Sequence, residues 1–159
     1  GSRYTPGGSI VGWGFHRRVL SFGAREAQIV GLAPRAGGDR GVEIESALLE
    51  ATEEKVAWIR EAAGARLDEI EIGTYPSLGA PVITDRDRPL LEEMAERLRG
   101  RFGVKIGIED LRSSPHVFVG TVDHLVEKFQ HLRETLGISS VMVGPMDVLA
   151  PVVERLAGT

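Results

Sequence analysis

The chain has 159 residues, of which 42% are hydrophobic and 26% charged, and its formal net charge is −4 at pH 7. This composition predicts one globular domain over residues 3–159, and the acidic balance argues against a nucleic-acid binder, which needs a basic face. No run reaches the roughly 20 apolar residues that span a bilayer, and there is no cysteine, so we expect no membrane association, no thiolate chemistry and a cytoplasmic location.

Hydrophobic periodicity predicts strands and helices in alternation along the chain. Gly1 and Ser2 are similar to a cleaved-tag remnant and are left out of this assignment. The predicted elements are, in chain order, strand 10–11, helix 16–27, strand 29–32, helix 43–63, strand 70–75 resuming at 82–83, helix 85–99, short helix 108–112, strand 117–120, helix 122–136, strand 141–144 and helix 145–157. Glycines 64, 100 and 137 mark predicted helix ends, and Thr121 is a predicted N-cap.

Alternating strands and helices of this kind are typical of an α/β fold with parallel strands joined by right-handed crossovers. An open sheet, a flavodoxin-like domain and half of a (βα)8 barrel all satisfy the pattern. Periodicity alone does not choose among these three folds.

Three segments in this order carry a more specific signal: residues 10–32, with the glycine-rich Gly12-Trp13-Gly14, residues 55–64, and residues 114–141. Together they resemble the C-terminal half of the luciferase-like flavin and deazaflavin oxidoreductases, over residues 9–157. The resemblance implies parallel βα units equivalent to strands five to eight of a TIM-type barrel. Half a barrel exposes sheet edges and an apolar interior, so we expect a homodimer or heteromer, or an upstream segment, to cover it.

The resemblance also implies a cofactor site at Gly12, Trp13, Gly14, His16 and Arg17, where a glycine turn after the first strand and a helix N-terminus would hold the phosphate of a deazaflavin coenzyme or FMN. Trp13 stands where the family has a small residue. The indole would either obstruct the phosphate or stack on a planar ligand. The alternative is that it has no role in binding and only packs a tight turn. The third glycine of a dinucleotide fingerprint is missing.

Substrate contacts are expected from loops that follow strands, because carboxyl ends of barrel strands build active sites. Arg35 and Arg40 follow the second strand, and Tyr75 and Ser77 follow the third. Taken alone, a residue of each of these kinds is more often an ordinary loop residue.

The four histidines suggest no metal site. His116 precedes an apolar strand and is expected to have a structural role near the amino-terminal face of the barrel. His124 and His131 are seven residues apart on one helix, a spacing unlike that of two ligands on adjacent turns, and we expect them to face solvent.

The expected function is therefore that of a flavin- or deazaflavin-dependent reductase or monooxygenase subunit acting on a small organic substrate once the barrel is completed. A cofactor-free cyclase or isomerase of a biosynthetic pathway and a non-catalytic partner of a full-length homologue are the alternatives.

Overall fold

The computed structural model describes residues 11–38, 41–143 and 146–157. Its elements in the first half are β1 (Val11–Gly14), α1 (Arg17–Glu26), β2 (Ile29–Leu32), the 3-10 helix η2 (Ile44–Ala47), α2 (Leu49–Ala63), the 3-10 helix η3 (Gly64–Glu69) and β3 (Glu71–Thr74). Those in the second half are β4 (Val82–Ile83), α3 (Asp87–Phe102), α4 (Ile108–Ser113), β5 (Val119–Gly120), α5 (Val122–Leu136), β6 (Ile138–Val141), the 3-10 helix η4 (Met146–Leu149) and α6 (Ala150–Leu156).

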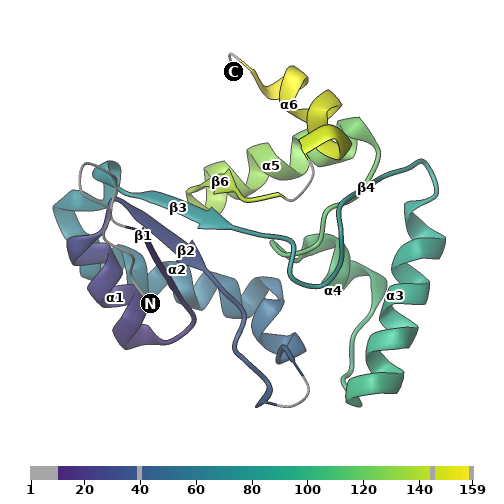
Figure 1. Ribbon diagram of the computed structural model, residues 1–159, viewed down its shortest axis with the longest axis horizontal. Coiled ribbons are helices and arrows are strands. Elements are labelled where there is room, and N and C mark those ends of the chain that lie inside the picture. Colours follow the sequence, from purple (N-terminus) through teal and green to yellow (C-terminus); the bar gives the residue numbers. More distant parts are fainter. Residues whose placement is uncertain (1–10, 39–40, 144–145, 158–159) are drawn as a thin grey trace.

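Four strands form a parallel sheet in the order β1-β2-β3-β6 (Figure 1). Helices α1, α2, α5 and α6 supply the apolar side chains that bury one face of this sheet, as parallel βα units require. Fully buried members of this main cluster include Leu20, Val30, Ile59, Leu125 and Val152. Across the described ranges, every helix is too short or too polar to serve as a membrane span.

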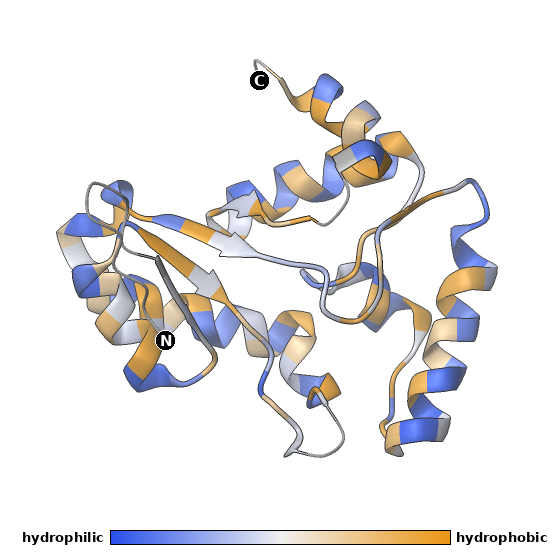
Figure 2. Ribbon diagram, in the orientation of Figure 1, coloured by the Kyte–Doolittle hydropathy of each residue, from blue (hydrophilic) through white to orange (hydrophobic). Residues whose placement is uncertain are grey.

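A satellite unit separates β3 from β6 in the sequence. It contains the two-stranded parallel sheet β4-β5 and the helices α3 and α4, which lie to the right in Figure 1. Hydrophobic and hydrophilic residues alternate along α3 (Figure 2), and its apolar side chains meet those of α4 and β5 in a second buried cluster. Val117 and Val119 belong to this second cluster, whereas Phe118 between them belongs to the main one.

Most predicted elements are present, and α5 has the predicted bounds. Its N-cap Thr121 accepts a hydrogen bond from the His124 N–H at 3.1 Å, and Gly137 ends it with φ of 70°. Gly64 likewise ends α2 with a positive φ. Gly100 lies inside α3, which continues to a left-handed Gly103, so the prediction of its end was wrong by one turn.

Three other predictions need correction. The helix expected over 43–63 is divided at Leu48, whose extended backbone separates η2 from α2. The segment 82–83 does not continue β3 but pairs with β5. The strand expected at 141–144 begins instead at Ile138, directly after the helix-ending Gly137, where it pairs with Ile72.

Candidate functional site

One row of residues crosses the sheet on the face opposite the main cluster. Trp13, Gly31, Gly73 and Ser140 are in register on the four strands. The indole of Trp13 lies on Gly31, because a Cβ built at that glycine would be 2.2 Å from two ring carbons. Gly31, Gly73 and Ser140 are small and therefore leave open space on this face of the sheet. The Trp13 indole fills part of that space.

A chain of aromatic contacts runs from this row past the carboxyl end of β3. Tyr75, the residue after β3, contacts Trp13 edge to face with ring centroids 5.5 Å apart. It contacts His116 in the same manner at 5.8 Å. T-shaped pairs of this kind add specific geometry to apolar burial, so these three rings hold one another in place at the end of the sheet where barrel enzymes place their active sites.

His116 is fully buried, and its Nδ1 atom lies 2.9 Å from the Tyr75 carbonyl oxygen and 3.2 Å from Thr74 Oγ1. Burial lowers the pKa of the imidazole to about 4, which the hydrogen bond to Tyr75 only partly offsets. The ring is therefore neutral at pH 7, and with Nδ1–H donating to the carbonyl, Nε2 is left as a lone-pair acceptor. That Nε2 atom is buried and has no partner among the described residues.

A second unpaired polar atom belongs to Ser77. Its backbone N–H donates to the His116 carbonyl at 3.2 Å, so the two residues are held together, while its hydroxyl oxygen is buried without a partner in the described part of the chain. Burial also raises the pKa of the Tyr75 phenol, which stays protonated at neutral pH. Ser77 is thus a partly exposed residue with an unpaired hydroxyl beside Tyr75, whereas His116 is completely covered.

Lys55, on helix α2, places a buried cation at the carboxyl end of β2. Only 4% of it is exposed, and its Nζ donates to the carbonyl oxygens of Ala33 and Ser46 at 3.0 and 2.6 Å. Burial lowers its pKa to about 8, and the nearby Arg35 contributes in the same direction. Lys55 therefore anchors the loop that follows β2 to helix α2.

The predicted substrate residues have different outcomes. Tyr75 and Ser77 lie together with His116 at the carboxyl end of β3. Arg35 is half exposed and pairs with Glu43 at 3.4 Å, and Arg40 lies outside the described residues. The substrate-binding role of all four predicted residues stays a prediction.

The predicted glycine turn was misplaced. Gly12, Trp13 and Gly14 are part of β1 and pair with β2, so the turn falls on the next two residues. A Cβ at Gly12 would approach the Gly23 backbone of α1 at 3.9 Å, and one at Gly14 would meet a Val19 methyl carbon at 2.7 Å. These glycines allow α1 to pack closely on β1, and that side of the strand does not fit a phosphate.

The two other predicted cofactor residues lie at the start of α1. His16 is the exposed N-cap, makes no side-chain capping bond, and packs against Phe15. Arg17 forms a two-pronged ion pair with Glu61 of α2, at 2.8 and 3.1 Å. This exposed ion pair links the start of α1 to α2, and the phosphate-binding role of Arg17 stays a prediction.

Two predictions made for the histidines, the placement of His116 and the exposure of His124, are wrong. His116 lies beyond the carboxyl end of β3 and not at the opposite face, because the satellite unit returns the chain to that end. His131 is exposed as expected, whereas His124 is half buried and its Nε2 is fully covered without a partner in the described residues. Within the same ranges, no three acidic or histidine side chains gather closely enough to hold a metal ion.

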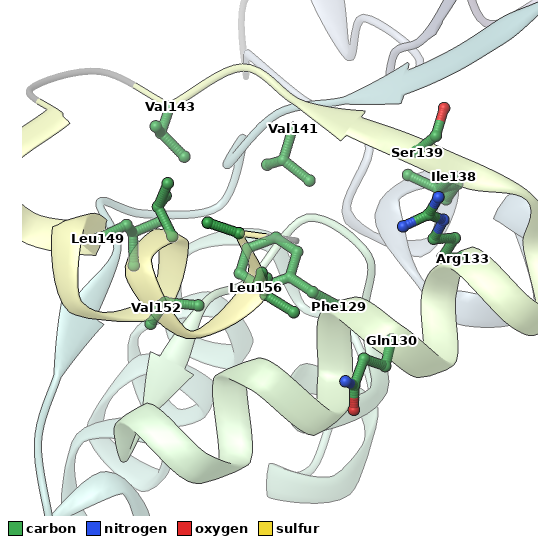
Figure 3. A pocket seen from close by; sticks show the side chains of 12 residues that line it. Phe129, Gln130, Arg133, Ile138, Ser139, Val141, Val143, Leu149, Val152 and Leu156 are labelled. Carbon is green, nitrogen blue, oxygen red and sulfur yellow. The ribbon is translucent and has the colours of Figure 1, made fainter. Parts of the chain in front are cut away.

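A cavity of about 350 Å³ lies away from this row, between α5, β6 and α6. Apolar side chains such as Val141, Leu149 and Leu156 surround the hollow (Figure 3). Arg133 and Ile138 lie next to each other at one side of this cavity.

Two solved structures share this fold. The coenzyme F420-dependent tetrahydromethanopterin reductase from Methanopyrus kandleri matches 85% of this chain with a TM-score of 0.51 and 17% identity, over 44% of its own length. The long-chain alkane monooxygenase LadA matches 92% of this chain with a TM-score of 0.51 and 18% identity, over 40% of its own length. No family model matches the sequence, and no curated protein matches it.

This chain therefore spans less than half the length of either structure. At such low identities the likeness establishes the fold alone. It confirms the predicted fold class, an α/β arrangement of parallel βα units that resembles half of a TIM-type barrel.

Proposed function

We propose that this chain supplies half of a luciferase-like oxidoreductase barrel and acts as a flavin- or deazaflavin-dependent reductase or monooxygenase on a small organic substrate once the barrel is completed. The observation that supports this is the parallel sheet, whose likeness to a reductase and a monooxygenase extends over at least 85% of the chain. The reductase is named for its dependence on coenzyme F420. The absence of cysteine is in keeping with a cytoplasmic location.

The ring part of such a cofactor fits the residues at the end of β3. Trp13 and Tyr75 offer aromatic surfaces, and the Ser77 hydroxyl, unpaired among the described residues, would donate or accept a hydrogen bond. His116 is fully buried and would hold Tyr75 in place from behind. A bound flavin or deazaflavin would supply hydride transfer, and these side chains would bind and orient its ring.

The phosphate of the cofactor does not fit at Gly12 and Gly14, because α1 occupies that side of β1. The phosphate would instead be bound by the other half of the barrel or by the loop residues Arg35 and Arg40. We therefore expect weak cofactor binding by a lone half barrel and stronger binding by a complete one.

Titration with coenzyme F420 and with FMN, followed by absorption and fluorescence, tests the proposal. We expect saturable binding by the completed barrel, and weaker binding after Ser77→Ala. Ser113→Ala, on an exposed position of α4 in the satellite unit, is the matched control and should leave affinity unchanged. If neither cofactor binds in any assembly state, the oxidoreductase proposal is wrong.

A cofactor-free isomerase or cyclase is the second candidate, and the position of Trp13 favours it. The indole covers Gly31 and so fills part of the face on which a planar cofactor would lie. Turnover of a substrate by colourless protein would support this second candidate, whereas a yellow cofactor retained through purification would exclude it.

A further inference from the structure

Exposed apolar side chains gather beside the two unpaired edges of the sheet. In the described ranges β1 pairs only with β2, and β6 only with β3. Among the side chains that the structure describes, seven large apolar ones are well exposed, and five of these lie at the edges: Val19 and Phe22 on α1, and Met142, Val148 and Val153 after β6. Unpaired edges with apolar flanks are surfaces that proteins normally cover.

The same two flanks carry opposite charge. Helix α1 contains three arginines and one glutamate, and Arg18 has no ion-pair partner within the part of the chain that is described. Arg17 is already paired with Glu61, which leaves Arg18 and Arg25 against Glu26 on α1. Residues 146–156 contain Asp147, Glu154 and Arg155, whose charge is already paired with Asp123 at 2.7 Å, and Arg133 lines the cavity on this flank. One positive charge is therefore in excess on the β1 flank and one negative charge on the β6 flank, which favours their association over pairing of like edges.

We propose that the cover is a second copy of this chain, so that β1 and α1 of each copy pack against β6 and α6 of the other. The four strands all run in the same direction, and a two-fold axis along that direction preserves it, so β6 of one copy would lie parallel to β1 of the next. Repeating this contact closes eight parallel strands with no free edge. This inference rests on the proposed function only in taking the closed barrel as the active form.

A further feature agrees with a second copy as the occupant. The cavity between β6, α5 and α6 includes Val153 in its lining and lies on the flank that would receive Phe22. In the closed barrel, Trp13 and Tyr75 of both copies would surround one shared space, so the candidate site is complete only in the dimer.

Light scattering and sedimentation equilibrium of the intact chain test the assembly. We expect twice the mass of one chain at micromolar concentration, and Phe22→Asp should reduce it to a single chain. Leu90→Asp is the matched control, because Leu90 is exposed on α3 of the satellite unit and should leave the dimer intact. A wild-type chain that is monomeric at 100-fold higher concentration overturns the proposal.

Cross-linking keeps the test decisive even if Phe22→Asp does not fold. The chain has no cysteine, so Phe22→Cys and Val153→Cys each introduce one thiol. A flexible bis-maleimide should link a mixture of the two variants but neither variant alone, since equivalent positions lie on opposite sides of the barrel. In the double variant Phe22→Cys/Val153→Cys, which carries two thiols, the closed dimer should give only a two-chain product. A ladder of higher oligomers from that variant would instead reveal an open chain of subunits and overturn the closed dimer.

The dimer and the cofactor can fail separately. A dimer that binds neither coenzyme F420 nor FMN would contradict the proposed function and leave the assembly standing. A monomer that binds either cofactor tightly would contradict the proposed dimer and leave the proposed function standing.

Discussion

Trp13 and Gly31 form a matched pair, in which the indole of one strand lies on the bare backbone of its in-register neighbour. No side chain other than hydrogen fits beneath the ring, because a Cβ there would be 2.2 Å from the ring carbons. The residues at these two positions therefore depend on each other.

Gly31→Ala should destabilise the chain by about 1–3 kcal/mol, the usual cost of overpacking a well-filled site. Gly73→Ala is the control in the same row, since its new methyl would meet Ser140 at an ordinary 3.7 Å and should change stability little. Urea denaturation measures both. Adding Trp13→Leu should restore most of the loss in Gly31→Ala; a double variant as unstable as the single one would contradict the pairing.

Stability should fall in mild acid because of His116. Its folded-state pKa of about 4 lies below the ordinary value of 6.5, so the unfolded chain binds the proton first as the pH falls. The free energy of unfolding should decrease by about 2 kcal/mol between pH 7 and pH 5. His116→Gln should remove most of this dependence, while His131→Gln, on the exposed surface, should retain it. Equal pH profiles for wild type and His116→Gln would refute the assignment.

Lys55 should also make stability rise with pH, but in the alkaline range. Its folded-state pKa of about 8 is below 10.5, so the unfolded chain holds more protons between these values and stability rises with pH there. Relative to Lys55→Met, the wild type should gain roughly 3 kcal/mol from pH 8 to 10.5. Lys105→Met, at an exposed position, should follow the wild type. Lys128, whose pKa burial lowers to about 7, is common to all three proteins and cancels in the comparison.

The helices were predictable because their signals are local. Thr121 and Gly137 bound α5 through capping interactions that involve only neighbouring residues. The strands were less predictable, because a strand's limits depend on its partner. Ile138 becomes a strand residue by pairing with Ile72, 66 positions earlier in the chain, and no local pattern reveals that contact.

The candidate site shows the same division. Tyr75 and Ser77 were predicted from their place after a strand. His116 was missed as a site residue because the satellite unit, which carries it back to the end of β3, has no signature in the sequence. A detectable signal existed for Lys55: it occupies the buried stripe of α2 with Thr52, Val56 and Ile59, where a lysine needs internal acceptors.

The segment that leads into β5 gives the molecule its cooperativity. Phe118 stacks on Phe129 in the main cluster at 5.1 Å, while its neighbours Val117 and Val119 belong to the satellite cluster. Displacing this segment would therefore remove one residue from the main cluster and two from the satellite cluster at the same time. The satellite unit and the sheet should therefore melt in a single transition, and a deletion of the satellite would remove a wall of the main core as well.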